Sequence, residues 1–162
     1  MERRGITHTA YLLLGGNLGD RAFYVNSAVA SLATLGHITA ASSLMETEPW
    51  GFTEPVPFFL NQVICLETIL EPECLLLECQ AIEKKLGRKR NQTPGPRTYQ
   101  SRTIDIDILL YDRLHYTSST LQIPHPRIQE RPFSVALLEE VLPKTLSLND
   151  FLTIEHDTRR TL

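Results

Sequence analysis

The sequence predicts an α+β fold in which an antiparallel sheet carries helices packed on one face, with extra elements at the C-terminus. Two observations predict this class. The apolar pattern changes between period two and helical spacing in the order strand, helix, strand, strand, helix, strand. The length of 162 residues, with 42% apolar and 22% charged residues, is typical of one soluble globular domain. This order of elements matches a ferredoxin-like sandwich.

The first third of the chain is predicted to contain a strand, a helix and a second strand. Thr9–Leu14 is the first strand, and Gly15–Asp20 is the turn after it. The turn contains neither G-x-G-x-x-G nor a following Lys-Ser/Thr pair. A tight strand-to-helix turn is therefore a better interpretation than a phosphate-binding loop. A helix with an apolar stripe then ends at Gly36, and Ser42–Thr47 is the second predicted strand.

The middle of the chain alternates regular elements with two irregular segments. Glu48–Pro57 holds three prolines and a glycine around the only tryptophan, which predicts a loop. Phe58–Thr68 alternates as a longer strand. Pro72 opens a helix that ends at Gly87. Arg88–Ser101 has no periodicity, and a structureless segment of that length in a compact domain is usually functional.

The last third of the chain begins with a strand over Arg102–Leu109. A short extended segment, Leu121–Pro126, precedes a helix over Pro132–Glu140. We expect one domain over residues 8–143, followed by a tail over 144–162 whose packing the pattern does not indicate.

The strongest functional signal is a pair of acidic residues in the strand that begins at Arg102. Three isoleucines alternate with Asp105 and Asp107, so the two carboxylates share the opposite face. Same-face residues on a strand lie roughly 6–7 Å apart along its axis. Two such carboxylates repel each other unless positive charge lies between them, which favours one or two divalent cations. A half-exposed strand whose polar face simply carries two acids is the alternative.

A basic segment leads into this strand. Residues 84–104 contain no acidic residue but hold seven of the chain's 16 lysines and arginines, although the net charge is −3. A metal-bound polyphosphate suits this arrangement, because both the cations and the arginines would neutralise it. Nucleic acid is the competing ligand, and the sequence pI of about 5.9 argues against a broad nucleic-acid footprint.

The cysteines and the apolar runs indicate a compartment. Cys65, Cys74 and Cys79 are odd in number and lack CxxC spacing, so we expect reduced thiols. No apolar run has the length of a signal peptide or of a membrane span. We therefore expect a cytoplasmic protein with no membrane partner.

Six further residues could contact a ligand or serve the structure alone: Gln80, Glu83, Asn61, His125, Trp50 and Phe133. Gln80 and Glu83 lie three apart on one face of a helix. His125 is held between two prolines, which suits contact with a phosphate or a base. For each residue the structural alternative stays open: a solvated polar group, a satisfied amide, a surface histidine or a packed ring.

Several motifs occur together in a fixed order: Gly15-Gly16-Asn17-Leu18-Gly19-Asp20, Phe59-Leu60-Asn61, Gln80-x-x-Glu83, Gly87-Arg88-x-Arg90, Arg102-Thr103-x-Asp105-x-Asp107 and Pro124-His125-(x)5-Arg131-x-Phe133. From about Tyr11 to Leu142 the chain resembles the 6-hydroxymethyl-7,8-dihydropterin pyrophosphokinases of folate biosynthesis. The resemblance implies a ferredoxin-like fold. It also implies transfer of pyrophosphate from ATP to the hydroxymethyl group of a reduced pterin, with release of AMP.

The resemblance also implies roles for individual residues. Asp105 and Asp107 would hold two Mg²⁺ ions on the phosphates of ATP, and Arg88 and Arg102 would complete the catalytic set. Positions that match the family's ATP site are Gln80, Glu83, Arg90, Ile108, His125 and Arg131. Positions that match its pterin site are Thr47, Trp50, Phe59, Asn61 and Phe133. The segments 48–57 and 88–101 correspond to loops that close over the substrates.

Two arginine-threonine pairs approach the acidic strand, and we expect Arg102 rather than Arg97 to be catalytic, because it lies three residues before Asp105. The chain departs from the family's commonest pattern at three places: Gln100-Ser101, Thr120 and Pro126. We expect a monomer whose partners are small-molecule substrates, without nucleic acid. Two other classes remain as alternatives: a different metal-dependent nucleotidyl or phosphodiester enzyme, and an RNA-binding ferredoxin-like module.

Overall fold

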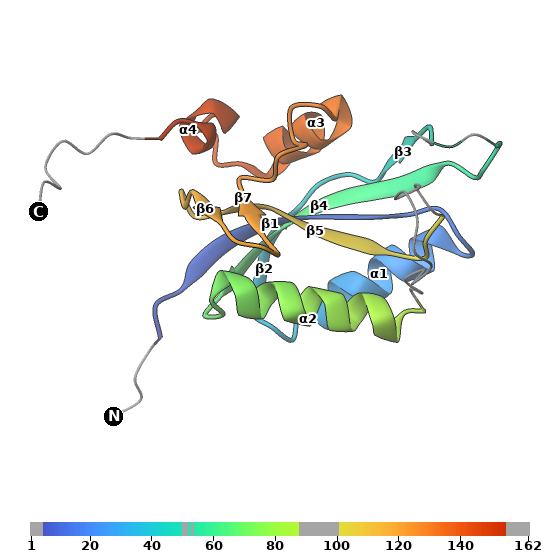
Figure 1. Cartoon of the computed structure of the whole chain (residues 1–162), viewed down its shortest axis with the longest axis horizontal. Helices are drawn as coiled ribbons and strands as arrows, with labels where there is room; N and C mark the ends of the chain where they lie inside the picture. The colour runs from blue at the N-terminus through green and yellow to red at the C-terminus, as the bar shows by residue number, and fades with distance from the viewer. Residues whose placement is uncertain (1–4, 50–51, 53, 88–100, 155–162) are drawn as a thin grey trace, which may run out of the picture.

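The computed structural model describes residues 5–49, 52, 54–87 and 101–154 (Figure 1). Its elements, in chain order, are β1 (His8–Gly16), α1 (Arg21–Leu32), β2 (His37–Ala41), β3 (Met45–Thr47), β4 (Phe59–Thr68), α2 (Pro72–Lys85), β5 (Asp105–Tyr111), β6 (Tyr116–Thr117), β7 (Gln122–Ile123), α3 (Pro132–Val141) and α4 (Leu148–Leu152). Within these residues, none of the helices combines the length and the apolar character needed to cross a bilayer.

The central sheet has the strand order β2-β4-β1-β5, and the short strand β3 also pairs with β4. All of these pairings are antiparallel. The α+β class predicted from the order of elements is confirmed, since antiparallel strands and two helices form the layers of the domain. The strand β5 lies at one end of this sheet, next to β1.

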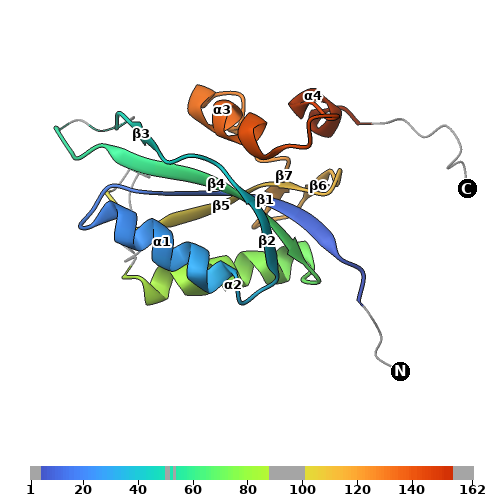
Figure 2. The same ribbon diagram turned by 180° about the vertical axis from the view of Figure 1, so that it is seen from behind.

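Helices cover both faces of the sheet (Figures 1 and 2). One face packs against α1 and α2 through an apolar cluster that includes Leu12, Leu14, Ile64 and Ile106. The other face packs against α3 and α4 through a second cluster that includes Leu137. The two helices predicted from the first half of the chain share one face, as expected for a ferredoxin-like sandwich, and the C-terminal helices lie on the opposite face.

The structure differs from the predicted elements between α1 and β4. The strand β2 was not predicted, and the predicted strand over 42–47 begins only at Met45. Ser42 lies between the two short strands and is buried. Its backbone N–H donates to the Val63 carbonyl, and its hydroxyl accepts from the Val63 N–H at 2.8 Å. A side chain thus replaces a ladder bond, which an alternation pattern cannot reveal.

The described part of the C-terminal tail contains α4. Ser147 and Asp150 form a capping box at its start. Phe151 is buried and meets the edge of Tyr11 with ring centroids 5.8 Å apart. The tail, whose packing the sequence pattern does not indicate, therefore extends the same core as α3 as far as Phe151.

Candidate active site

A cavity of about 760 Å³ lies between the sheet and the segment that leads into α3. Its lining comes from β1, β4 and β5 below and from the segment 125–133 beside them. This volume falls in the range of sites that bury a small-molecule ligand. The cavity has a charged half around β5 and an aromatic half around β4.

The floor of the cavity is one row of residues across neighbouring strands. Asn61 of β4 pairs with Gly15 of β1, and Gly15 pairs with Asp105 of β5. A Cβ atom at Gly15 would lie 2.6 Å from Asn61 Oδ1, so no other residue fits there without displacing the amide. The glycine therefore leaves open the space between the amide and the carboxylate.

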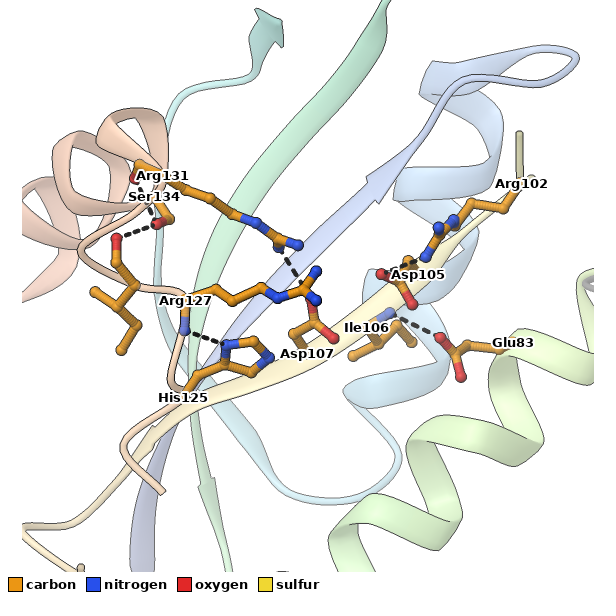
Figure 3. A network of polar contacts seen from close by, with 10 residues as sticks. Glu83, Arg102, Asp105, Ile106, Asp107, His125, Arg127, Arg131 and Ser134 are labelled. Carbon is orange, nitrogen blue, oxygen red and sulfur yellow. Dashed lines mark hydrogen bonds and ion pairs between the residues drawn. The ribbon is translucent and has the colours of Figure 1, made fainter. Parts of the chain in front are cut away.

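The two aspartates project into this cavity from β5, and an arginine compensates for each of them. Arg102 Nη1 lies 3.0 Å from Asp105 Oδ2, and Arg131 Nη1 lies 3.6 Å from Asp107 Oδ2 (Figure 3). The aspartate side chains are about a quarter exposed, at 23% and 24%. Partial burial strengthens such pairs relative to surface pairs. Four charges from three segments thus gather at one end of the cavity.

The predicted alternation of β5 is confirmed by burial. Ile104, Ile106 and Ile108 are at most 4% exposed and pack in the cluster beneath α1 and α2, on the face opposite the aspartates. Since Ile108 is 2% exposed, its side chain belongs to the core. Any contact between this residue and a ligand would have to come from its backbone.

Glu83 ties α2 to the outer edge of β5. Its carboxylate is 3% exposed, and Oε2 accepts the backbone N–H of Ile106 at 3.0 Å. An edge strand has backbone N–H groups without a partner strand, and the N–H of Ile106 donates to the Glu83 side chain instead. Gln80, one turn earlier on α2, is half-buried. Neither side chain lines the cavity.

His125 is held as a neutral ring. Its backbone N–H donates to the Leu109 carbonyl at 2.9 Å, and its Nδ1 accepts the backbone N–H of Arg127 at 3.2 Å (Figure 3). This bond assigns the ring proton to Nε2. Burial, together with the nearby charges of Arg131 and Arg127, lowers the pKa of His125 to about 4. The ring is therefore a hydrogen-bond donor rather than a cation at neutral pH.

Arg131 is positioned by the start of α3. It is the N-cap residue, and Pro132 fixes the first helical position. The Ser134 hydroxyl lies 2.8 Å from the Arg131 carbonyl and 3.1 Å from the Ile128 carbonyl, so it secures the turn before the helix. The arginine side chain consequently extends from the helix start toward Asp107 (Figure 3).

The aromatic half of the cavity is centred on Asn61. This amide is 4% exposed, and Nδ2 donates to Thr47 Oγ1 at 2.8 Å and to the Met45 carbonyl at 3.2 Å. Both donors of Nδ2 are therefore used to hold the side chain in one orientation. Thr47 also pairs with Phe59 across β3 and β4, which brings two predicted pterin-site residues side by side.

Three phenylalanines line this half. Phe59 and Phe133 were predicted, whereas Phe52 was not, and its ring centroid lies 6.1 Å from that of Phe59 at an interplanar angle of 43°. The two tilted rings provide an apolar wall in this half of the cavity. Phe52 lies in a segment that the sequence marks only as irregular, so no pattern could have selected it.

Nine of the predicted site residues line the cavity: Thr47, Phe59, Asn61, Arg102, Asp105, Asp107, His125, Arg131 and Phe133. Gln80, Glu83 and Ile108 lie outside its lining. Trp50, Arg88, Arg90 and Arg97 lie outside the described residues. The cavity also contains Arg127, which the sequence analysis missed. Its signal was present as a second arginine in the run Pro126-Arg127 that leads to Arg131.

Comparison with known proteins gives consistent likenesses. A family model described as 7,8-dihydro-6-hydroxymethylpterin-pyrophosphokinase (HPPK) matches residues 11–143. The 2-amino-4-hydroxy-6-hydroxymethyldihydropteridine pyrophosphokinase of Porphyromonas gingivalis is 43% identical over 82% of this chain and 90% of its own length. The protein of that name from Bacillus subtilis is 41% identical over 84% of this chain and 79% of its own length.

Solved structures resemble the fold. A wild-type Plasmodium falciparum HPPK-DHPS chain with pteroate superposes with a TM-score of 0.63 at 17% identity, covering 86% of this chain. Another HPPK-DHPS, in complex with substrates, gives a TM-score of 0.63 at 13% identity over 87% of this chain. This chain spans about two fifths of those longer chains, 40% and 41%. At such identities the likeness establishes the fold.

Proposed function

This chain belongs to the 7,8-dihydro-6-hydroxymethylpterin-pyrophosphokinase family of folate biosynthesis, and we propose that it transfers pyrophosphate from ATP to that pterin in the cavity beside β5. The observation that carries this site is the pair Asp105 and Asp107, each beside an arginine, at the charged end of the cavity. A polyphosphate with divalent cations complements both signs of charge at that end.

The residues present fit a divalent cation. Asp105 and Asp107 offer carboxylate oxygens, and Mg²⁺ is commonly held by one or two carboxylates together with substrate phosphates. No third acidic, histidine or cysteine residue completes such a group within the described part of the chain. We assign the remaining ligands to phosphate oxygens and water. Two Mg²⁺ ions bound by these aspartates would neutralise the phosphates and polarise the reacting oxygens.

The reaction needs positive charge near the bond that breaks. The hydroxymethyl oxygen of the pterin attacks the β-phosphorus of ATP, and the bond from that phosphorus to the oxygen shared with the α-phosphate breaks. AMP leaves with the electron pair, and the hydroxyl proton is released. We assign Arg102 and Arg88 to stabilising the charge that develops on these phosphate oxygens. Arg102 already lies beside Asp105, which supports its assignment.

The nucleoside of ATP is proposed to lie toward α2 and the outer edge of β5. The N–H of Ile106 points away from β1 to Glu83, and Ile108, two residues on, presents its backbone to the same edge. Backbone groups of Ile108 could therefore bind a base edge, with Gln80 nearby on α2. The remaining residues assigned to ATP are Arg90, His125 and Arg131, of which His125 donates through Nε2–H and Arg131 contacts phosphate.

The pterin is proposed to bind in the aromatic half. Phe59 and Phe133 would hold the flat ring by stacking, and Phe52 would extend that wall. Asn61 and Thr47 would bind its polar edge from the cavity floor. Trp50 is assigned to the same site. The hydroxymethyl group would then point from this half toward Asp105.

We further propose a monomeric enzyme of the cytoplasm with small-molecule partners only. Cys65, Cys74 and Cys79 form no disulfide, in keeping with a reducing compartment. Light scattering at assay concentration tests the oligomeric state, and a stable dimer would contradict this proposal.

The function is tested by following AMP and ADP separately with Mg-ATP. We expect AMP release that depends on added 6-hydroxymethyl-7,8-dihydropterin and stops on chelation of the metal. Phosphorus NMR should show the pyrophosphate group on the pterin. Release of ADP, or AMP formation without pterin, would contradict the assignment. Tighter binding of an RNA oligonucleotide than of Mg-ATP would favour the RNA-binding alternative.

A further inference from the structure

The turn after β1 contacts the backbone on both sides of Arg102. The backbone N–H groups of Asn17 and Leu18 donate to the Arg102 carbonyl at 2.9 and 3.3 Å. Asn17 Oδ1 accepts the Arg102 N–H at 2.9 Å. Both backbone polar groups of this arginine are therefore bonded to the turn, although 85 residues separate it from Asn17.

The Asn17 amide also uses its donors. Nδ2 donates to Ser101 Oγ at 3.0 Å and to the Pro57 carbonyl at 3.2 Å. Asn17 is 1% exposed, and its amide oxygen and both amide protons are engaged. The Asn17 side chain thus joins three segments. These are the turn after β1, the segment before β4 at Pro57, and the segment before β5 at Ser101.

Glycine makes this close approach possible. A Cβ atom at Gly16 would lie 2.1 Å from the Thr103 carbonyl oxygen, so any larger residue would push the two segments apart. Gly19, with φ of +65°, turns the chain back toward α1. The glycines at 16 and 19 therefore serve close packing of the turn rather than phosphate binding. The N–H groups of Asn17 and Leu18, which a phosphate-binding loop would offer to its ligand, donate to the Arg102 carbonyl instead.

We propose that Asn17 is a positioning residue that holds Arg102 in its catalytic place. The inference rests on the proposed role of Arg102 in pyrophosphate transfer. With the backbone of Arg102 fixed on both sides, only its side-chain torsions remain to be ordered, and the guanidinium is held beside Asp105 before substrate binds. The bond to Pro57 links the same arginine to the strand that carries Phe59 and Asn61.

The first test compares Asn17→Ala with Asn17→Asp. Asn17→Ala loses all three side-chain bonds, and we expect kcat to fall about 100-fold while the Kd of a non-hydrolysable ATP analogue changes less than about threefold. Asn17→Asp keeps the acceptor for the Arg102 N–H but loses both donors. It should lower kcat by only about tenfold, with a raised pterin KM because a carboxylate oxygen replaces the donor to the Pro57 carbonyl.

The matched control is Thr68→Val. Thr68 is 2% exposed and also makes two side-chain bonds, to the Leu35 carbonyl and from the Leu70 N–H, at the other end of β4 from the cavity. This variant should lower Tm by a similar amount and leave kcat unchanged. A loss of kcat in Thr68→Val as large as in Asn17→Ala would overturn the proposal, since general destabilisation would then explain both.

The decisive experiment is a double-mutant cycle with Arg102→Met. If Asn17 acts through Arg102, either Asn17 variant should lower kcat by less than about twofold once Arg102 is already Met. A loss that persists undiminished in that background would overturn the proposal, and Asn17→Asp gives this readout even where Asn17→Ala does not fold. If Arg102→Met itself leaves kcat unchanged, the proposed function of Arg102 fails instead, so the two failures are distinguishable.

Discussion

The two faces of the central sheet differ in how completely they are covered. The face beneath α1 and α2 is closed along its length, and Leu12, Leu14 and Ile106 are at most 4% exposed there. The opposite face is covered by α3 and α4 over part of its length, around Tyr11, Leu13, Val63, Cys65 and Leu109. Its remaining end is the cavity. The apolar area buried on the closed face stabilises the sheet as a whole. Part of the other face can therefore carry charged residues that would be costly to bury.

The strand β5 contains this contrast within two neighbouring residues. Ile106 points into the closed face, and Asp107 points into the cavity beside Arg131. Because side chains of a strand alternate, the same seven residues supply both the core and the charged site. Side chains on one face of a strand can therefore stabilise the fold while those on the other face form the site. Four predictions test this separation.

The largest expected effect is on the cavity side of β5. Asp105→Ala and Asp107→Ala should each lower kcat by about 10³-fold or more, because each removes a carboxylate that we propose as a ligand for the cations, worth several kcal/mol. Tm should change little. Steady-state kinetics and calorimetric Mg²⁺ titration with an ATP analogue measure both effects. Glu46→Gln, at an exposed carboxylate also paired with an arginine, is the control and should keep kcat. Near-normal turnover in either aspartate variant would contradict the site.

For Ile106, which lies between the two aspartates but faces the core, we expect a loss of stability without a loss of activity. Ile106→Ala should lower the free energy of unfolding by about 2–5 kcal/mol, because it removes buried methyl groups and leaves a cavity under α1 and α2. The folded fraction should keep kcat within about threefold of the wild-type value, since the side chain faces away from the site. Urea unfolding and active-site titration separate the two quantities. A kcat loss equal to that of Asp107→Ala would show that the faces are not independent.

A smaller effect is expected in the aromatic half. Phe52→Leu should raise the pterin KM about three- to tenfold, because an aromatic contact contributes about 0.5–1.5 kcal/mol beyond burial. The Kd for the ATP analogue should stay constant, since the charged half is untouched. Phe23→Leu, at an exposed ring on α1, is the matched control. An unchanged pterin KM would remove Phe52 from the site.

The last prediction concerns pH. Burial and two arginines lower the pKa of His125 to about 4, whereas Asp105 acts in the opposite direction. Between pH 6.5 and 4 the unfolded chain therefore binds more protons at this position than the folded chain, so stability rises with pH across that window and is lost on acidification. His125→Gln should flatten this dependence. An NMR titration that shows the ring protonating near pH 6.5 would contradict the neutral assignment.

Much of the fold followed from local pattern, and one region did not. The helix beginning at Pro72 and the long strand β4 were predicted close to their observed bounds, because their apolar residues recur at the spacing of one buried face. The first helix was predicted to end at Gly36 but ends at Leu32. The strand β2 was missed because it has only five residues, and its burial alternates between exposed and partly buried positions, of which Ile38 is the one large apolar side chain. So short a pattern gives little apolar contrast.

Some residues of the site could likewise be predicted from the sequence, and others could not. Alternation in β5 placed both aspartates on one face, and burial confirmed it. Arg127 and Phe52 could not be selected, since each lies in an irregular segment whose course depends on distant contacts. The role of Glu83 as a partner of the Ile106 N–H is likewise tertiary, because α2 and β5 are separated by the segment 86–104.

The sequence by itself determined the class of fold, the face on which the two aspartates lie and the family to which the chain belongs. Periodicity and ordered motifs are local properties, so they can be seen without a structure. Only the tertiary structure decided that α3 and α4 cover the face opposite α1 and α2, that His125 is neutral, and that Asn17 bonds both sides of Arg102. These features depend on burial and on hydrogen bonds between residues far apart in the chain, and the pattern of neighbouring residues does not specify such contacts.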